Sequence, residues 1–461
     1  MSFLSLLPFL FITLLIFDTV NHLMIFSYNL YPSSYAQQDR IPGIRKMNTQ
    51  NEDPEIRDPM LMVELVTDGL EFPTTMAFAG PEDILVLEKQ KGTVRRIVNG
   101  NLLDSPLLDV NVNGLDERGM LGITITQNNG SKDSHRDVSS APSIYVFLYY
   151  TETQGQDKED EDEENILGNR LYRYELVHNK LINPKLILDL PANTSPEHNG
   201  GAITIGPDEN LYVPVGDLKG GDKGWLTLTQ NYPKGIKPDG RAGILRVTQD
   251  GEIVNGKGIL GDEHPLDMYF AYGIRNSFGI DFDPVTGNLW DTENGPNYGD
   301  EINMVEPGFN SGWQHVQGMA PQDSHIPDSN NLVDFGGKGK YSNPEFLWND
   351  TVGPTAIKFL NSDKLGKEYQ NDAFVGDVTT GNIYHFKLNK DRNKFLLTGE
   401  LADRIVDKDN RLTGEEEIVF GNGFAGISDI EVGPYDGYLY IVSLGQGKIY
   451  RIVPSSNEPN S

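Results

Sequence analysis

The chain contains no cysteine, which excludes disulfides, thiolate metal sites, iron–sulfur clusters and cysteine nucleophiles. Basic residues are also scarce: 38 Lys and Arg stand against 67 Asp and Glu, for a formal net charge of −29. This charge repels polyphosphate and anionic headgroups, so a nucleic-acid partner is not expected. The phosphate-binding Gly-Lys-Ser/Thr loop, the His-Glu-x-x-His helix and the Gly-x-Ser-x-Gly turn are absent as well, which argues against nucleotide hydrolysis, zincin proteolysis and α/β-hydrolase chemistry.

Small and aromatic residues are abundant instead. The 461 residues include 49 Gly, 27 Pro, 20 Tyr and 20 Phe, a composition typical of short strands joined by tight turns. One sequence pattern recurs: a Gly-Pro or Asp-Pro turn, an apolar strand, a polar turn and a second apolar strand. Its six copies begin near residues 80, 143, 206, 283, 359 and 433, at intervals of 63, 63, 77, 76 and 74 residues. This spacing predicts an all-β fold, a six-bladed β-propeller of four-stranded blades.

An alternative fold, two separate β-sandwiches, would need a linker near the middle of the chain, and none is visible. A propeller also accounts for the missing disulfides. Its large radial core and its joined first and last blades stabilise the chain without covalent links.

The N-terminal segment is apolar from Phe3 to Phe17, and the small residues of Ser34-Tyr35-Ala36 suit a signal-peptidase site. Residues 1–36 are therefore predicted to be a signal peptide or, because the first residues lack Lys and Arg, an uncleaved N-terminal membrane anchor. Either prediction places the folded part in a secreted or otherwise extracytoplasmic setting. The N-glycosylation sequons at Asn129, Asn193 and Asn349 agree with an extracytoplasmic location.

The remaining segments follow from composition. Polar residues 37–60 are predicted to be a disordered linker and residues 454–461 a disordered tail, which leaves residues 61–453 for the propeller. The acidic run at residues 157–164 is too charged to pack and is expected in a solvated loop.

Candidate functional residues are sought where propellers bind ligands, on the loops at one mouth of the central channel. Four polar clusters flanked by glycine or proline meet this description. They span residues 114–122, 196–201, 273–279 and 293–303.

Within these clusters, three segments resemble a known family. They are His198-Asn199-Gly200-Gly201 followed by residues 205–208, the pair Arg275-Asn276, and Asn294-Gly295-Pro296 leading to residues 300–303. Their order and spacing resemble the soluble pyrroloquinoline quinone (PQQ)-dependent sugar dehydrogenases, also called the glucose/sorbosone dehydrogenase family, over about residues 65–453. The resemblance implies oxidation of an aldose to a lactone, with PQQ as hydride acceptor, Ca²⁺ as Lewis acid and an external electron acceptor.

The resemblance also implies roles for individual residues. His198 is the base that takes the sugar hydroxyl proton, and Arg275 stabilises negative charge on the quinone oxygen. The implied cofactor-binding residues are Glu117, Glu197, Arg275, Asn276, Asn294 and Asp300. The implied metal-binding residues are Gly295 and Pro296, through backbone carbonyls, and Glu301. The residues alone leave other interpretations open: a structural histidine, an arginine paired with a carboxylate, and an ordinary Asn-Gly-Pro turn.

The sequence departs from the family at three positions. PQQ carries three carboxylates, for which the family supplies one lysine and two arginines. Thr379 stands where the lysine is expected, and Gly426 and Ser428 stand where the arginines are expected. Any compensation has to come from Arg118, Lys338, Lys340 or Arg411, folding in from other loops.

Three functions therefore remain open at this stage. The first is a PQQ- and Ca²⁺-dependent aldose dehydrogenase. The second is a propeller without catalysis that binds a sugar or a partner and has lost PQQ, and the third is a Ca²⁺-dependent lactonase. Fold alone does not choose among them.

Overall fold

The structure is a computed structural model that describes residues 53–128, 143–154, 165–192, 195–218, 230–231, 238–320, 332–407 and 414–455. Internal contacts divide the chain into residues 1–40 and a compact unit of residues 41–461, to which every described residue belongs. The predicted N-terminal segment, the acidic run, and the sequons at Asn129 and Asn193 lie outside the described residues. In the described part, no helix combines the length and apolar character needed to span a bilayer.

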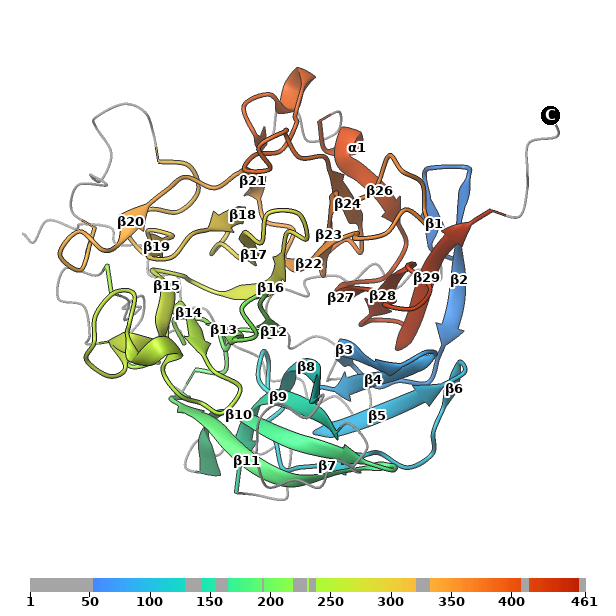
Figure 1. The fold of residues 1–461 in the computed structure, drawn as a ribbon. Coiled ribbons are helices and arrows are strands. Elements are labelled where there is room, and N and C mark those ends of the chain that lie inside the picture. The colour runs from blue at the N-terminus through green and yellow to red at the C-terminus, as the bar shows by residue number, and fades with distance from the viewer. Residues whose placement is uncertain are drawn as a thin grey trace, which may run out of the picture. The chain divides into compact units, whose positions relative to one another are not determined.

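The strands hydrogen-bond into six sheets, which we number in chain order (Figure 1). Sheet 1 contains β3 (Pro73–Gly80), β4 (Asp83–Glu88), β5 (Thr93–Val98), β6 (Asn101–Leu102) and β7 (Leu108–Asp109). Sheet 2 contains β8 (Met120–Asn128), β9 (Ser143–Thr153), β10 (Ile166–Val177) and β11 (Lys180–Leu190). Sheet 3 contains β12 (Thr204–Ile205), β13 (Leu211–Val215), β14 (Gly243–Val247), β15 (Tyr269–Tyr272), β19 (Phe309–Asn310) and β20 (Lys340–Tyr341).

The second half of the chain forms the other three sheets. Sheet 4 contains β16 (Ser277–Phe282), β17 (Leu289–Glu293), β18 (Tyr298–Val305), β21 (Phe346–Asp350) and β25 (Ile405–Val406). Sheet 5 contains β22 (Pro354–Phe359), β23 (Ala373–Asp377), β24 (Ile383–Phe386), β26 (Val419–Asn422) and β1 (Glu55–Ile56). Sheet 6 contains β27 (Ile427–Val432), β28 (Leu439–Ser443), β29 (Lys448–Pro454) and β2 (Leu61–Thr67). The described helices are short: α1 (Gly414–Ile418) and 3₁₀ turns at Val254–Gly256, Leu266–Met268 and Gly399–Leu401.

The second strand of several sheets is buried on both faces, which explains the short continuous apolar runs in the sequence. Every residue of β13, β17, β23 and β28 is buried. Such strands lose the alternation of polar and apolar residues because each sheet packs between two neighbours. Polar turns end these runs; at the Asp283-Pro284 turn, for example, the Asp283 carboxylate accepts hydrogen bonds from the Val285 N–H and the Thr286 hydroxyl.

The sheets of the compact unit surround a common axis, and the two ends of its chain meet in sheet 6 (Figure 1). Strand β2 pairs antiparallel with β29, with Met62 opposite Val453. Hydroxyl groups also connect neighbouring innermost strands: Thr75 Oγ1 donates to the Leu121 carbonyl at 3.0 Å, and Ser428 Oγ donates to the Pro73 carbonyl at 2.8 Å. The expected joining of the first and last parts of the propeller is therefore present.

A cavity of about 290 Å³ lies on the axis. One innermost strand of each sheet lines it: β3, β8, β12, β16, β22 and β27. The loops that enter the N-terminal ends of these strands form what we call the channel mouth. They are residues 72–75, 114–120, 195–201, 273–277, 351–354 and 424–428, together with the neighbouring turns 294–296 and 378–381.

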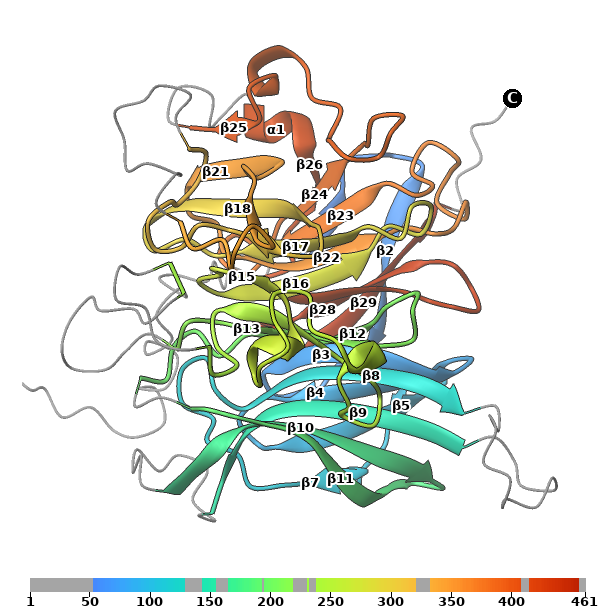
Figure 2. The ribbon, with the colours of Figure 1, turned by 60° about the vertical axis from the view of Figure 1, so that its left-hand side comes forward.

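The prediction of an all-β propeller is confirmed, and each of the six sequence repeats lies in a different sheet. The prediction of four strands in every sheet is wrong, because only sheets 2 and 6 have four. Distant segments add strands elsewhere; Figure 2 shows one of them, β25, beside β21 at the outer edge of sheet 4. The predicted linker also ends before residue 60, because β1 pairs with β26 and fixes residues 55–56.

The side chains of Lys358, Asp429 and Glu431 line the cavity, and Asp281 lies against Lys358. Lys358 Nζ lies 2.7 Å from Glu431 Oε2 and 3.3 Å from Asp281 Oδ1. Burial lowers the pKa of Lys358, but the attraction of these carboxylates outweighs burial and holds the pKa above its usual value. Asp429 lies nearby and accepts the backbone N–H of Met76 at 2.8 Å. Lys358 therefore supplies the positive charge that balances part of this acidic group.

Replacing Lys358 by methionine is expected to destabilise the fold. The side chain keeps its length, but Asp281 and Glu431 lose their counter-charge inside the cavity. We expect the free energy of unfolding in urea at pH 7 to fall by about 3 kcal/mol, the lower end for a buried ion pair that loses one partner, since the Lys358 side chain is 19% exposed. Lys364→Met on the surface is the control, and equal loss in both variants would contradict this account.

Candidate functional site

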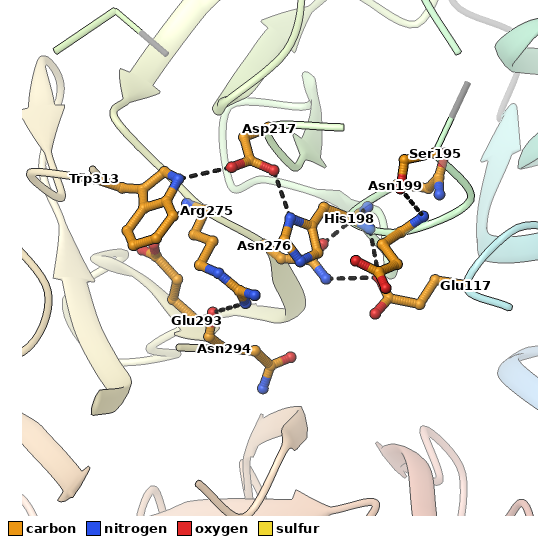
Figure 3. A network of polar contacts seen from close by, with 12 residues as sticks. Glu117, Ser195, His198, Asn199, Asp217, Arg275, Asn276, Glu293, Asn294 and Trp313 are labelled. Carbon is orange, nitrogen blue, oxygen red and sulfur yellow. Dashed lines mark hydrogen bonds and ion pairs between the residues drawn. The ribbon is translucent and has the colours of Figure 1, made fainter. Parts of the chain in front are cut away.

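His198 lies in the loop before β12 and contacts Asp217, which follows β13 (Figure 3). The His198 side chain is 5% exposed, and its Nδ1 lies 2.5 Å from Asp217 Oδ1. The other carboxylate oxygen of Asp217 accepts the Trp313 Nε1–H at 2.7 Å. Because an ionised carboxylate only accepts hydrogen bonds, Nδ1 of His198 carries the proton and Nε2 keeps its lone pair.

The charge of Asp217 is stabilised by this arrangement. Burial raises the pKa of Asp217, but its electrostatic interaction and hydrogen bond with His198, followed by the charge of Arg275 and the hydrogen bond from Trp313, outweigh burial and leave the pKa below its usual value. Asp217 is therefore ionised at neutral pH and orients the imidazole.

Glycines allow the His198 loop to pack this closely. A Cβ on Gly216 would lie 2.4 Å from the His198 carbonyl oxygen, and a Cβ on Gly200 would lie 2.2 Å from the Pro214 carbonyl oxygen. Gly200 also has φ +81°, which disfavours other residues. Gly200, which follows His198, and Gly216, which precedes Asp217, are therefore required because a side chain at either position would clash with the backbone.

Glu117 connects three loops of the mouth. Its Oε2 accepts the His198 backbone N–H at 2.6 Å and the Asn276 Nδ2–H at 2.9 Å, as Figure 3 shows. Asn276 Oδ1 in turn accepts the Gly200 N–H at 3.2 Å. One carboxylate thereby fixes loops from sheets 2, 3 and 4 relative to one another.

Arg275 lies on the wall next to Asp217. Its NH1 donates to the Asn294 carbonyl at 2.7 Å, and its guanidinium lies 5.5 Å from the centre of the Trp313 ring. Its backbone N–H donates to Glu293 Oε1 at 2.7 Å, and its carbonyl accepts the Asp217 N–H at 2.8 Å. The Arg275 Nε is buried and has no hydrogen-bond partner among the described residues.

The turn that contains Gly295 and Pro296 is held by Asp300. Asp300 Oδ1 accepts the Gly295 N–H at 2.8 Å, while Oδ2 accepts the N–H groups of Val352 and Gly353 at 2.7 Å each. Burial raises the pKa of Asp300 to about 6. Asp300 therefore joins the turn to the entry of β22 through its side chain.

Glu301 does not lie with Gly295 and Pro296. Successive side chains of a strand point to opposite faces, so Glu301 points away from the face that Asp300 uses. It is buried and accepts the Gly318 N–H at 2.6 Å and Gln317 Nε2–H at 3.2 Å. Across the described ranges, no group of three or more His, Asp or Glu side chains could hold a metal ion.

The remaining predicted residues lie around the same mouth. Asn294 donates from its backbone N–H to the Asn276 carbonyl at 2.8 Å and from Nδ2 to the Pro354 carbonyl at 3.1 Å. Glu197 is half-buried, and its charge raises the pKa of Asp116 after the larger effect of burial. The mouth thus brings together His198, Arg275, Asn276, Asn294, Glu117 and Glu197.

The sequence prediction missed two residues of the site, Asp217 and Trp313, and gave no individual role to Glu293, which begins the polar cluster at residues 293–303. Asp217 ends the apolar strand phrase Leu211–Val215, and a carboxylate directly after such a strand was the available signal. Trp313 had no such signal, and no local pattern encodes the contacts of Trp313 with Asp217 and of Glu293 with the Arg275 backbone.

The positions expected to carry cations lie at the mouth but do not carry charge. Gly381 packs against residues 425–426, where an added Cβ would lie 2.7 Å from the Ala425 nitrogen. Thr379 donates its backbone N–H to the Val352 carbonyl, and Ser428 bonds to Pro73.

Among the described residues, the basic side chains named as substitutes do not replace them at that side. Lys338 and Lys340 are exposed near the outermost strand of sheet 3, and Arg118 donates to the Ser195 carbonyl at 3.1 Å on the side of sheets 2 and 3. Arg411 lies outside the described residues.

The fold and site define an all-β propeller with a buried His–Asp pair and an arginine at one end of the axis. Comparison with known proteins extends this: the glucose/sorbosone dehydrogenase family model matches residues 70–451, and the chain belongs to that family. Its relatives and the fold indicate an oxidoreductase of the aldose sugar dehydrogenase type.

Individual relatives are distant in sequence. The aldose sugar dehydrogenase of Escherichia coli (strain K12) is 23% identical over 397 residues, covering 85% of this chain and 92% of that one. Quinoprotein glucose dehydrogenase B of Acinetobacter calcoaceticus is 27% identical over 268 residues, covering 55% and 52%. The PQQ-bound structure of the aldose sugar dehydrogenase from Streptomyces coelicolor is similar in fold, with a TM-score of 0.57, 20% identity, and coverage of 87% and 100%.

Asp217→Asn is expected to destabilise the protein at pH 7 by about 1.5–3 kcal/mol, the contribution of a hydrogen bond to a charged group. The folded pKa of Asp217 is depressed, so its stabilisation is present above the unfolded pKa and is lost as the pH falls through the folded pKa. The difference between the two proteins should therefore shrink below about pH 4.

Urea unfolding between pH 7 and pH 3 measures this difference. Asp363→Asn, on an exposed loop, is the control and should change little. A constant difference across the whole range would show that the Asp217 charge is not involved.

Proposed function

We propose that the protein oxidises the anomeric carbon of aldose sugars to lactones, with His198 as the base. The observation that carries the proposal is the buried His198–Asp217 pair beside Arg275 at the channel mouth. Its membership of a family with relatives named as sugar dehydrogenases supports the substrate class. We also propose that the six sheets are the six blades of one closed propeller.

The chain's own groups suit this reaction. The sugar hydroxyl on C1 gives its proton to His198 Nε2, the nitrogen that Asp217 leaves free. The C1–H bond breaks with its electron pair leaving as hydride to an acceptor, and a C1=O bond forms. Asp217 stabilises the imidazolium that results, and Glu117 keeps the His198 backbone in place.

PQQ and Ca²⁺ are the cofactors that the family resemblance implies, and the site fits them only in part. Arg275 Nε is a buried donor without a partner, suited to a quinone oxygen, and Gly295 lies close by through Asn294. The opposite side of the mouth holds Thr379, Gly426 and Ser428, which offer no charge to three carboxylates. The residues do not fit the whole tricarboxylate, so no step is assigned to it.

The setting of the reaction is also a proposal. The apolar residues 3–17 and the small residues 34–36 support export or N-terminal membrane attachment, and thus an extracytoplasmic enzyme. Electrons would pass to an external acceptor.

The missing cations favour one competing function, a sugar-binding propeller without redox activity. That function predicts thermal stabilisation by sugar without turnover.

Purified protein is expected to oxidise aldoses in an assay with a reducible dye, tested with and without PQQ and Ca²⁺. Replacing His198 by alanine should lower kcat/KM by about 10²–10⁴, the usual contribution of a general base. His264→Ala is the matched control, because the His264 side chain is 71% exposed.

Activity that is unchanged in His198→Ala would contradict the assigned role. Absence of turnover under every condition, with a rise in melting temperature on adding sugar, would favour the binding protein. Lactone hydrolysis without any acceptor would favour the lactonase.

A further inference from the structure

The contacts around the channel mouth establish which side of it lacks cations. Arg275 bonds to Asn294, and Asn294 bonds to the Pro354 carbonyl at the start of β22. An added Cβ on Gly353, the preceding residue, would lie 3.2 Å from Thr379 Oγ1. Thr379 is thus connected to Asn294 through residues 353–354. Sheet 5 is therefore linked to Arg275 through Asn294, and Thr379 on that side carries no charge.

The same holds for sheet 6. Gly381 packs against residues 425–426, and Ala425 is 8% exposed. The turn at residues 377–382 uses its polar groups internally, since Asp377 accepts the N–H groups of Thr380 and Gly381 and the hydroxyl of Tyr384. The mouth segments 351–355, 378–382 and 423–428 contain no Lys or Arg. This half of the mouth therefore presents small uncharged groups.

The other half carries acidic groups. Glu117 accepts hydrogen bonds from both the His198 backbone and the Asn276 amide, which occupies donors that face the mouth. Asp116 and Glu197 lie close enough to interact electrostatically. Lys89 and Arg118 balance part of this charge; Lys89 Nζ donates to the Gly114 carbonyl and Arg118 NH2 donates to the Ser195 carbonyl. Among the described residues, Lys89 and Arg118 thus face the three carboxylates of Asp116, Glu117 and Glu197, so this side offers a ligand with three carboxylates no surplus of positive charge.

The contacts beside Arg275 suit a planar uncharged ring better than a tricarboxylate. The half-buried Trp313 indole lies beside the Arg275 guanidinium, with the ring centre 5.5 Å from the guanidinium carbon. Flat groups of this kind stack with aromatic rings. Arg275 Nε supplies a buried hydrogen-bond donor without a partner. One donor and one stacking surface suit a carbonyl on an aromatic-like ring.

We infer that the hydride acceptor used at this mouth is an uncharged quinone and not a tricarboxylate. This inference rests on the proposed function. The aldose is oxidised by two electrons: its C1–H hydride passes to the quinone, its hydroxyl proton passes to His198, and the quinone gains a proton from water to become a hydroquinone. Lactone and hydroquinone are the products.

The test compares two acceptors with the full-length protein. With glucose or another aldose present and no PQQ added, 1,4-benzoquinone should be reduced to hydroquinone, followed by its ultraviolet absorbance. Binding of PQQ, with Ca²⁺ present, is measured separately by quenching of tryptophan fluorescence, which does not depend on activity. We expect PQQ binding that is weaker than 10 μM, and no increase in rate when PQQ is added at 1 μM.

A charge-restoring variant gives an independent readout. Thr379→Lys should increase PQQ affinity at least tenfold, because it supplies one charge-assisted contact at the uncharged side of the mouth. Val285→Lys is the matched control; Val285 is 58% exposed in the turn after β16, at the opposite end of that strand from the mouth, and its substitution should leave PQQ affinity unchanged.

The outcomes separate this inference from the proposed function. Submicromolar PQQ binding by the wild-type protein, with sugar oxidation only when PQQ is added, would overturn the inference and keep the function. Lack of oxidation with either acceptor would overturn both. The wild-type comparison decides the matter even if Thr379→Lys does not fold.

Discussion

The hydrogen bond between His198 and Asp217 is the interaction on which the site depends. It sets the tautomer of the imidazole and so leaves one nitrogen able to take a proton. Its geometry requires Gly216, because any side chain there would meet the His198 carbonyl. It also depends on sheet 2, whose Glu117 holds the His198 backbone, and on the segment after β19 of sheet 3, whose Trp313 holds Asp217. The bond therefore forms only when neighbouring sheets are assembled.

The repeat in the sequence was sufficient to predict the fold class, because each copy encodes two strands and the turn between them. Every copy lies in its own sheet. The strand count could not be predicted in the same way. Strands β1 and β25 pair with partners more than 50 residues away, and each is only two residues long. Such short pairings are stabilised by their surroundings and leave no periodic pattern in the sequence.

The site was predictable where a motif reflects close backbone packing. The glycines after His198 and the pair Arg275-Asn276 mark loops that approach other backbone, and these loops do meet at one mouth. Glu301 shows the opposite case: it neighbours Asp300 in sequence, yet strand alternation sends the two side chains to different faces. Residues such as Trp313 gain their role only from a partner that is distant in sequence.

The net charge of the protein affects which ligands can approach the channel mouth. With a net charge of −29, the protein surrounds the mouth with a field that opposes anions and does not act on neutral molecules. A family site that binds a tricarboxylate must overcome such a field with local cations, and here sheets 5 and 6 supply none at the mouth segments described. Among the described residues, Arg275 lies beside Asp217, and its backbone and NH1 already bond to Glu293, Asp217 and Asn294. The local charge and the net charge therefore both oppose the approach of an anionic ligand to the mouth. Neither opposes an uncharged one.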